Sequence, residues 1–267
     1  MIRASVIAVI LVVAGAVARA AEPATPVERA WRIDGVERKA IVYAPADATT
    51  AKCPLLFSFH GHGGSARAAT ARFRFQALWP EAIVVYMQGL PTAGMLTDPQ
   101  GLKAGWQSAE GAESDRDLKF FDAVLASMKR DYKVDQKRIF ATGHSNGGGF
   151  TYVLWAARGS VFAAVAPCAA IPGRSALKMK PKPALHVAGK EDPLVRFGWQ
   201  ERAMAAERKI NGCDEAGKPW ESAGPCVGTI YPSKSGTPLI TVIHPGGHAL
   251  PDAAFTLIVR FFKAQQH

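Results

Sequence analysis

The sequence is short of acidic side chains and contains no internal repeat or low-complexity linker. Its 267 residues include 22 Asp and Glu against 32 Lys and Arg, which gives a formal net charge of +10 at pH 7. Nothing in this pattern indicates a repeat array or a second module on a flexible linker. The basic residues are scattered and no nucleic-acid-binding motif accompanies them, so nucleic acid is not predicted as a partner.

Only one long hydrophobic run is present, near the start of the chain. It occupies residues 4–17, and the Ala-Arg-Ala tripeptide at residues 18–20 resembles a signal-peptide cleavage site. We predict that residues 1–20 are a signal peptide and that residues 21–267 form one catalytic domain, secreted or periplasmic, with no stable membrane insertion after cleavage. An uncleaved anchor is the alternative, because the run approaches the length of a membrane span.

Cysteine is scarce, with four in the chain. Disulfides persist in exported proteins, and Cys213 and Cys226 bracket an insertion, residues 214–225, that a disulfide would hold together. We therefore predict a disulfide between them. Cys53 enters one predicted strand and Cys168 leaves another, so in a parallel sheet they lie at opposite ends and are predicted to be free, buried thiols.

The most informative segment is residues 138–149, where a β-branched and aromatic run breaks into Gly-His-Ser-Asn-Gly at residues 143–147. An apolar helical pattern follows at once. This is the G-x-S-x-G nucleophile elbow in the strand, turn and helix context that the motif requires. Glycine is needed on both sides of the serine because a Cβ there would collide with the neighbouring strand and helix. The elbow predicts Ser145 as a catalytic nucleophile.

The acid partner of this serine is predicted at the exit of a later strand. Residues 183–189 form a buried-strand pattern, and an Asp-Pro pair follows shortly after it. The carboxylate of Asp192 would accept a hydrogen bond from a histidine Nδ1 and stabilise the imidazolium formed during turnover. Glu191 beside it and the more distant Asp214 are alternatives.

The general base is predicted in the loop after the last strand. Residues 239–244 are strand-like and lead into Pro-Gly-Gly-His, whose glycines leave the ring of His248 free to reach Ser145. Its Nε2 would take the serine proton during attack and return it to the leaving alcohol. His244 lies on the strand itself and is predicted to be structural.

A glycine-rich loop offers donors for a developing oxyanion. Residues 60–65 read His-Gly-His-Gly-Gly-Ser directly after a buried-strand pattern. We predict an oxyanion hole made by the backbone N–H groups of His62 and Asn146, with Gly61 or Gly63 as alternatives to His62. The two histidines of this loop lack further ligands at a recognised spacing, so neither a metal nor a cofactor is predicted.

The remaining pattern predicts an α/β fold, with a mostly parallel, doubly wound sheet and helices on both faces. A turn at residues 34–35 separates two β-prone runs and predicts a hairpin. Helical patterns separate most later strands, and the catalytic candidates follow strand ends, where such sheets bind ligands. Residues 88–114 are predicted as a long loop overhanging the site. The predicted strands are residues 30–33, 39–43, 54–59, 82–86, 138–142, 161–165, 183–188 and 239–243.

Several of these segments together resemble one group of esterases. Residues 60–65 are similar to the H-G-x-G-G segment of the polyhydroxybutyrate depolymerase and feruloyl esterase group of the α/β-hydrolases, which includes carbohydrate esterase family 1. Residues 134–148 resemble its V-D-x-x-R-[IV]-[FY]-[AV]-T-G-x-S-N-G-G segment, and residues 162–167 its F-A-A-V-A-P. His248 falls within its G-G-H, although Ala-Leu-Pro replaces the T-W-P that often follows. The resemblance covers residues 30–262.

This resemblance implies a single α/β-hydrolase domain that hydrolyses carboxylic esters through an acyl-serine intermediate. The expected substrates are small, oligomeric or polymeric esters of hydroxycinnamic or hydroxyalkanoic acids. Members of the group shape the acyl pocket near the missing tryptophan, so Leu250 is expected to contact the substrate. Trp106 lies in a Gly-Trp stretch that also resembles the group and is expected either in the pocket wall or in the core.

Two other functions remain open from the sequence. Some peptidases of the α/β-hydrolase type use the same nucleophile order, often with an additional gating domain. A non-catalytic binding protein on the same scaffold would usually have lost one residue of the triad, and all three candidates are present.

Overall fold

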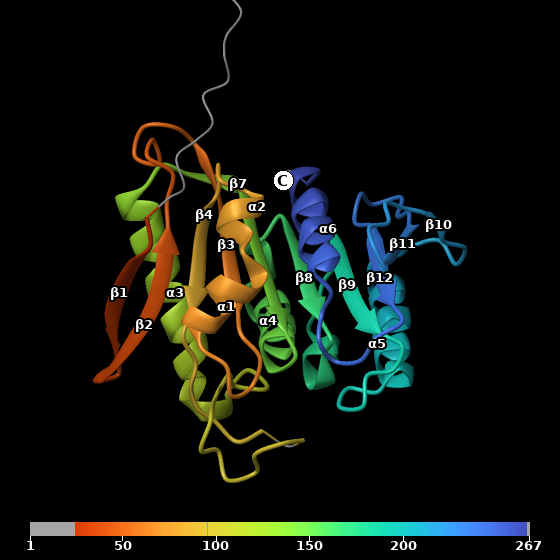
Figure 1. Cartoon of the computed structure of the whole chain (residues 1–267), viewed down its shortest axis with the longest axis horizontal. Helices are drawn as coiled ribbons and strands as arrows, with labels where there is room; N and C mark the ends of the chain where they lie inside the picture. Colours follow the sequence, from red (N-terminus) through yellow and green to blue (C-terminus); the bar gives the residue numbers. More distant parts are fainter. Residues whose placement is uncertain (1–24, 95, 266–267) are drawn as a thin grey trace, which may run out of the picture.

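The fold is built on one large sheet (Figure 1). The computed structural model describes residues 25–94 and 96–265, and the predicted signal peptide, residues 1–20, lies outside them. The strands of the large sheet are β1 (Val27–Ile33), β2 (Val36–Tyr43), β3 (Cys53–Phe59), β4 (Ile83–Met87), β7 (Val134–His144), β8 (Ala164–Cys168), β9 (Ala184–Gly189), β10 (Lys218–Pro219), β11 (Val227–Tyr231) and β12 (Leu239–His244). Their order across the sheet is β1-β2-β4-β3-β7-β8-β9-β12-β11-β10.

The centre of this sheet is parallel and its edges are antiparallel. Parallel pairing runs from β4 through β3, β7, β8 and β9 to β12. β1 and β2 form the predicted hairpin, which turns through Asp34 and Gly35, both at positive φ. At the other edge, β12, β11 and β10 pair antiparallel. The sequence pattern misses β10 and β11, because β10 is only two residues long and lies in a segment rich in turn residues.

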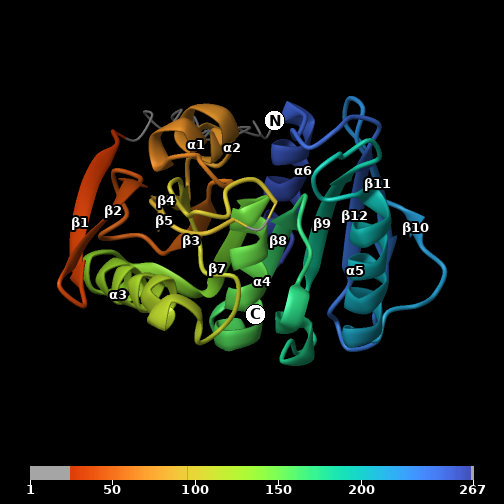
Figure 2. The same cartoon turned by 90° about the horizontal axis from the view of Figure 1, so that it is seen from below.

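Helices cover both faces of the sheet, as predicted. Figure 2 shows α1 (Ala66–Phe73), α2 (Phe75–Leu78) and α6 (Asp252–Lys263) on one face and α3 (Arg116–Asp131), α4 (Asn146–Arg158) and α5 (Phe197–Ile210) on the other. Side chains alternate between the faces along each strand, so two cores form. Phe57 packs in the core under α3 and α4, and its neighbour Leu56 packs in the core under α1 and α6. No helix in the described ranges is long and apolar enough to cross a membrane.

The segment between β4 and α3 hangs below the sheet in Figure 1, at the edge where the parallel strands end. Its regular pieces are short: β5 (Leu90–Pro91), β6 (Ala104–Gly105) and the 3-10 helix η1 (Ala112–Asp115). This agrees with the predicted long loop at residues 88–114. Two further 3-10 turns, η2 (Gly159–Val161) and η3 (Gly173–Leu177), follow α4 and β8.

The predicted disulfide between Cys213 and Cys226 is not formed, since all four cysteines are free thiols. The two residues lie on opposite faces of the sheet. Cys213 packs against the core under α3, α4 and α5, whereas Cys226 is part of the core under α6. Their closeness in sequence does not bring them together, because the sheet separates them. Cys53 and Cys168 are both buried, as predicted.

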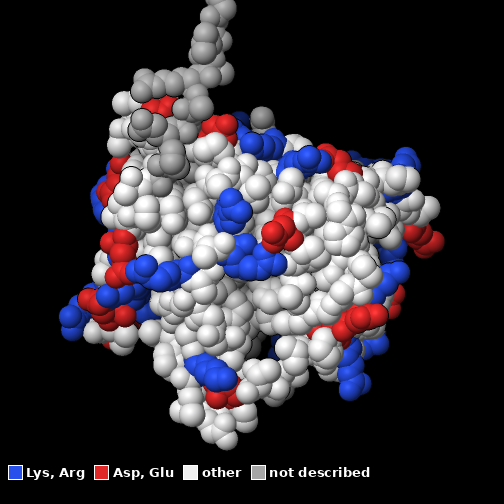
Figure 3. Space-filling view, in the orientation of Figure 1, with Lys and Arg blue, Asp and Glu red and all other residues white. Residues whose placement is uncertain are grey.

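The surface on the side of α1 and α6 carries mixed charge. Figure 3 shows acidic side chains among the basic ones across this face, with large uncharged areas between them. This arrangement agrees with the scattered basic residues of the sequence and offers no single basic track on the face shown.

Candidate active site

The nucleophile elbow holds Ser145 between β7 and α4. Its backbone has φ 56° and ψ −120°, in a region that residues other than glycine rarely adopt. Its N–H donates to the carbonyl of Cys168 on β8 at 2.9 Å. A Cβ on Gly143 would lie 2.3 Å from the carbonyl oxygen of Gly147, and one on Gly147 would lie 2.3 Å from that of Phe59. Only glycine fits at either position, so the close packing that the motif predicts is present.

The three side chains predicted as a triad lie in hydrogen-bond contact. Nε2 of His248 is 2.7 Å from Oγ of Ser145, and Nδ1 of His248 is 2.8 Å from Oδ2 of Asp192. The side chain of His248 is 17% exposed, whereas that of Asp192 is fully buried. Of the alternative acids, Glu191 is exposed and Asp214 lies beyond α5, beside the β10–β11 edge. The order of atoms allows Nε2 to accept the serine proton while the carboxylate holds Nδ1–H.

The Asp192 carboxylate is bonded at both oxygens. Oδ1 accepts the backbone N–H groups of Leu194 and Val195, each at 2.9 Å. Oδ2 accepts from His248 and also from Nε2 of Gln200 at 3.2 Å. A buried carboxylate needs such donors to remain charged. Gln200 could not be predicted from the sequence, because no motif marks a single glutamine on a later helix.

The glycine-rich loop after β3 lies beside the serine. A Cβ on Gly61 would lie 3.5 Å from Cβ of Ser145. The N–H of Gly63 is already engaged, since it donates to the carbonyl of Ala104 at 2.7 Å. The backbone N–H of Asn146 belongs to the first turn of α4, where N–H groups have no partner within the helix. The glycine-rich loop and the N-terminal turn of α4 therefore both lie beside the nucleophile.

The first histidine of this loop, His60, is hydrogen-bonded to protein groups through both ring nitrogens. His60 donates Nδ1–H to the carbonyl of Gly61 at 2.8 Å and accepts the N–H of Gly89 at Nε2 at 3.0 Å. Burial lowers the pKa of His60, so the ring stays neutral and fixed in this tautomer. Among residues 25–94 and 96–265, no three His, Cys, Asp or Glu residues are grouped closely enough to hold a metal ion.

A cavity of about 310 Å³ opens beside Ser145 and His248. Its walls come from the loop after β3, from α1 and from the loop after β9 that carries Asp192. The side of α1 and Leu194 is largely apolar, while Arg72 and Thr97 add polar groups. The remaining lining residues are His60, Gly61, His62, Gly64, Ser65, Ala68, Ala69, Phe73 and His144.

Comparison with known proteins places the chain in a family. Residues 32–169, just over half of the chain, match acetyl xylan esterase (AXE1). The chain belongs to the AXE1 family of carboxylesterases.

Curated relatives of this AXE1-family chain include feruloyl esterases. Feruloyl esterase C of Emericella nidulans is 29% identical over 198 residues, which cover 73% of this chain and 69% of that protein. Probable feruloyl esterase C of Aspergillus niger is 31% identical over 201 residues, with the same coverage of 73% and 69%. A bifunctional acetylxylan esterase/xylanase of Neocallimastix patriciarum is 31% identical over 170 residues, but this chain spans only 23% of its length.

Solved structures share the fold at low sequence identity. An acetyl xylan esterase from Aspergillus awamori superposes with a TM-score of 0.69 at 14% identity, covering 89% of this chain and 99% of that one. An S-formylglutathione hydrolase from Agrobacterium tumefaciens gives 0.66 at 14% identity, covering 93% and 98%. The predicted single α/β-hydrolase domain and the resemblance to feruloyl and carbohydrate esterases are confirmed. The polyhydroxybutyrate depolymerase part of that resemblance is not.

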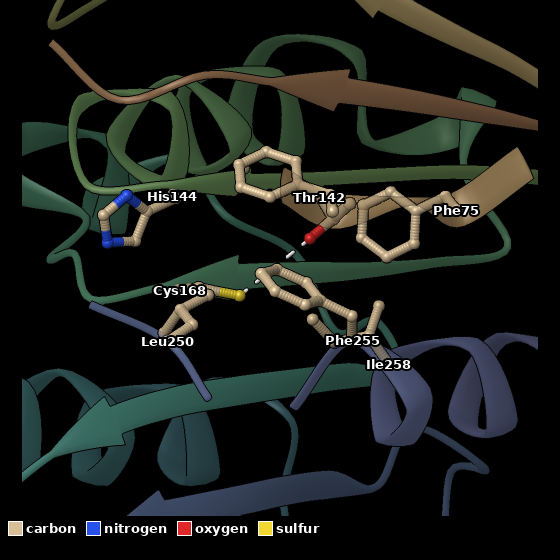
Figure 4. A pocket seen from close by; sticks show the side chains of 9 residues that line it. Phe75, Thr142, His144, Cys168, Leu250, Phe255 and Ile258 are labelled. Atoms are coloured by element: carbon tan, nitrogen blue, oxygen red, sulfur yellow. Dashed lines mark hydrogen bonds between the residues drawn. The ribbon is translucent and has the colours of Figure 1, made fainter. Parts of the chain in front are cut away.

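Trp106 and Leu250 lie in the core rather than on the wall of the cavity. Trp106 is 1% exposed, stacks on Phe150 with ring centroids 5.4 Å apart and donates Nε1–H to the carbonyl of His60 at 2.9 Å. Leu250 is 4% exposed and packs beside His144 and α6 (Figure 4). The expected substrate contacts of both residues are therefore corrected. For Trp106 the alternative of core packing holds, because the indole completes an aromatic stack and satisfies its N–H there.

His144, the residue before the nucleophile, also contributes to this AXE1-family site. It donates Nε2–H to the backbone carbonyl of His248 at 2.7 Å, and the two rings lie 4.7 Å apart. Burial lowers the pKa of His144 to about 4, so the ring is neutral at ordinary pH. It occupies the variable position of G-x-S-x-G, where sequence gives no signal. His244, by contrast, is buried on β12, and burial lowers its pKa as well.

The side chain of His62 ties the long loop after β4 to the glycine-rich loop. Its Nε2 is 3.1 Å from Oδ2 of Asp98, which also accepts the N–H of Lys103 at 2.8 Å. The hydrogen bond from Lys103 is the main reason that the pKa of Asp98 is lowered. A Cβ on Gly94 or Gly105 would lie 2.9 or 2.7 Å from the His62 ring. His62 was predicted to act through its backbone, and no sequence pattern indicated this role of its side chain.

Proposed function

We propose that this chain is an exported serine carboxylesterase with Ser145 as nucleophile, His248 as general base and Asp192 as the acid. One observation carries the proposal: Ser145, at positive φ on the elbow, is hydrogen-bonded through His248 to a buried carboxylate. This arrangement prepares a serine hydroxyl for attack on an acyl carbon. Membership of the AXE1 family supports an ester as the bond that is cleaved.

In the first half of the reaction, Oγ of Ser145 attacks the ester carbonyl carbon while its proton passes to Nε2 of His248. The imidazolium is stabilised by Asp192, and the carbonyl oxygen becomes an oxyanion. The backbone N–H groups of His62 and Asn146 are proposed to bind that oxygen. When the tetrahedral intermediate collapses, the C–O bond to the alcohol breaks and Nε2–H protonates the departing oxygen, leaving an acyl-serine.

In the second half, water takes the place of the alcohol. Nε2 of His248 accepts a proton from this water as its oxygen attacks the acyl carbon, and the same N–H groups bind the second oxyanion. Collapse returns the proton to Oγ of Ser145 and releases the carboxylic acid.

For the substrate, we propose acetyl or hydroxycinnamoyl esters of cell-wall polysaccharide. The support is the family match and the feruloyl esterases among the relatives. Beside Ser145, the apolar side of the cavity, with Phe73 and Leu194, offers contacts for an acyl group, and its volume of about 310 Å³ is in the range of small-molecule sites. Esters of hydroxyalkanoic acids would use the same chemistry and are the competing substrate.

An assay panel tests this proposal with purified protein. It contains p-nitrophenyl acetate, acetylated xylan, methyl ferulate, polyhydroxybutyrate and a peptide amide. We expect turnover of the first three and none of the amide. The Ser145→Ala variant should lose all turnover while its circular dichroism spectrum is unchanged, and Ser58→Ala, at a buried serine of β3, should keep it. A protein that turns over none of the esters, or turns over the amide, would contradict the proposal.

Export is proposed from the hydrophobic run and the Ala-Arg-Ala site at residues 4–20. N-terminal sequencing of the protein from the periplasm or medium of an expressing bacterium should find Ala21 first. A chain that keeps Met1 and stays with the membrane fraction would indicate the uncleaved anchor instead.

A further inference from the structure

A chain of buried polar side chains continues from Asp192 into the interior. Nε2 of Gln200, on α5, donates to Oδ2 of Asp192 at 3.2 Å and to the carbonyl oxygen of Val195 at 2.7 Å. On its other side, Oε1 of Gln200 lies 3.2 Å from Nε2 of His186, on β9. The amide thus joins the carboxylate of the proposed triad to a second histidine that has no contact with the cavity.

These contacts decide how the Gln200 amide is oriented. The Asp192 carboxylate and the Val195 carbonyl are both acceptors, so the NH₂ end must face them. Oε1 then faces His186 and needs a donor, which requires that Nε2 of His186 carries a proton. The reversed amide would place Oε1 against two acceptors and the NH₂ group against an N–H.

The other ring nitrogen of His186 contacts Tyr152 and Glu207. Its Nδ1 lies 2.8 Å from the hydroxyl of Tyr152, on α4, and 3.0 Å from Oε1 of Glu207, on α5. The Tyr152 hydroxyl donates to the same Glu207 oxygen. Because the Tyr152 hydroxyl has only one proton, a further proton, on Nδ1 or on Glu207, is needed to bond Nδ1 to the hydroxyl oxygen or to Oε1. Wherever it lies, the proton on Nε2 of His186 stays directed at Gln200.

The burial of this network is complete. Tyr152, His186, Gln200 and Glu207 are each 0% exposed. Gln200 and Glu207 are seven residues apart on α5, so they share one face of the helix, with His186 opposite them. Apolar side chains would fill this space at a smaller cost in free energy, because every buried polar group needs a hydrogen-bond partner. Oε2 of Glu207 has no such partner among the described residues. Stability of the core alone does not explain the choice.

We propose that Gln200 is a positioning residue for Asp192, and that His186, backed by Glu207 and Tyr152, keeps its amide oriented. Without Gln200, Oδ2 has His248 as its single partner and the carboxylate loses one of its four hydrogen bonds. This proposal rests on the proposed function, since Asp192 orients the base only if Ser145 is the nucleophile.

The Gln200→Met variant removes the amide at nearly constant volume. We expect kcat to fall roughly 10- to 100-fold with KM changed by less than about 3-fold, because the base is misplaced while the cavity is intact. The acidic limb of the kcat/KM profile should move to higher pH. Without the amide, the negative charge on Oδ2 is stabilised by His248 alone and therefore favours the imidazolium more strongly. Should the methionine variant not fold, Gln200→Asn, which shortens the amide, is expected to give the same shift.

Gln107→Met is the matched control. Gln107 is also a fully buried glutamine with a carboxylate partner, because its Nε2 donates to Asp115 at 2.8 Å. Its removal should lower the melting temperature but leave the pH profile where it is. Equal effects of the two variants on kcat and on the acidic limb would reduce Gln200 to a structural role and overturn the proposal.

A double-variant cycle tests the link to His186. His186→Leu should lower kcat less than Gln200→Met does, because the amide keeps two of its partners. The double variant should be no slower than Gln200→Met alone, since His186 acts only through the amide. Additive losses would show that His186 acts independently, and would overturn that half of the proposal.

The rate of phosphonylation of Ser145 by a fluorophosphonate separates this proposal from the proposed function. The probe reports the activated serine without any ester substrate. If the wild-type serine does not react, the proposed function fails and the positioning role fails with it. If it reacts at the same rate in Gln200→Met, the positioning role alone fails. The expected result is reaction of the wild type and roughly 10- to 100-fold slower reaction of the variant.

Discussion

The two sides of Ser145 are held in different ways. On the acid–base side, the loops after β9 and β12 carry Asp192 and His248, and the side-chain atoms themselves are fixed by hydrogen bonds. On the side of the proposed oxyanion hole, which we call the oxyanion side, the loop after β3 is held by its surroundings: the His62 ring packs against two glycines and bonds Asp98. Proton transfer needs side chains in fixed positions, whereas an oxyanion needs backbone N–H groups left free.

This difference explains where glycine and polar residues are used. Close backbone approach at Gly94 and Gly105 lets the long loop pack tightly against the His62 ring. On the acid–base side, buried polar groups such as Gln200 and the neutral His144 instead hold Asp192 and His248 in place by hydrogen bonds. Substitutions on the oxyanion side should therefore act through the position of the loop, and those on the acid–base side through the chemistry of His248.

The largest effect is expected from Asp192→Asn, which breaks the acid–base side alone. The amide cannot hold the same tautomer of His248, so kcat should fall about 10⁴-fold with the fold intact. Steady-state kinetics with an activated ester measure the loss. Glu191→Gln, at the exposed neighbouring residue, is the control and should leave kcat unchanged. A large loss in the control and none at residue 192 would make Glu191 the acid.

Gly147→Ala should disturb both sides together. A Cβ there would lie 2.3 Å from the carbonyl oxygen of Phe59, the residue that leads into the oxyanion loop. We expect a loss of about 3 kcal/mol in the free energy of unfolding, measured in urea, and a loss of activity. Gly149→Ala, on the same helix with open space around its Cβ position, should gain about 0.5–1 kcal/mol. A tolerated Gly147→Ala would refute the tight contact.

His144→Gln should change how stability depends on pH. The pKa of His144 is about 4 in the folded chain, below its ordinary value of 6.5. Between pH 6.5 and 4 the unfolded chain therefore takes up a proton that the folded chain refuses, so stability is lost as the pH falls. Urea unfolding at pH 7 and pH 5 should show a wild-type loss about 1–2 kcal/mol larger than that of the variant. Equal losses in the two proteins would contradict the neutral, buried ring.

The smallest effect is expected on the oxyanion side, from Asp98→Ala. Without this carboxylate the His62 ring loses its Nε2 partner and the long loop loses a tie to the cavity rim. We expect kcat to fall roughly 5-fold with KM little changed, since the oxyanion that the His62 loop is proposed to bind forms only as the reaction proceeds. Asp34→Ala, at an exposed ion pair with Lys119, is the matched control and should leave both constants unchanged. An unchanged kcat would contradict a role of Asp98 in positioning the proposed oxyanion loop.

Local signals account for what was predicted well. The strand, the glycines and the helix around Ser145 are contiguous in sequence, so their packing is decided by neighbours. The candidates Asp192 and His248 follow strand ends of a parallel sheet, and such ends meet at one edge. The structure brings all three side chains together, as that logic requires. Their catalytic roles stay predictions.

Contacts between segments that are distant in space or in sequence could not be predicted from the sequence. Cys213 and Cys226 are near in sequence, yet the two faces of the sheet keep them apart. The contact between His62 and Asp98 joins segments 36 residues apart through a loop with no regular pattern. Trp106 was predicted in the cavity wall or in the core and Leu250 at the substrate, and the structure buries both side chains in the core.

The α/β fold and the three side chains that meet at the elbow could be predicted from strand patterns, glycine spacing and chain order, and the esterase family from the resemblance of several short segments. Only the tertiary structure decided which amide, ring and carboxylate stand behind them, such as Gln200 behind Asp192. A hydrogen bond between distant segments depends on how helices and strands pack, and no short pattern of residues records that packing.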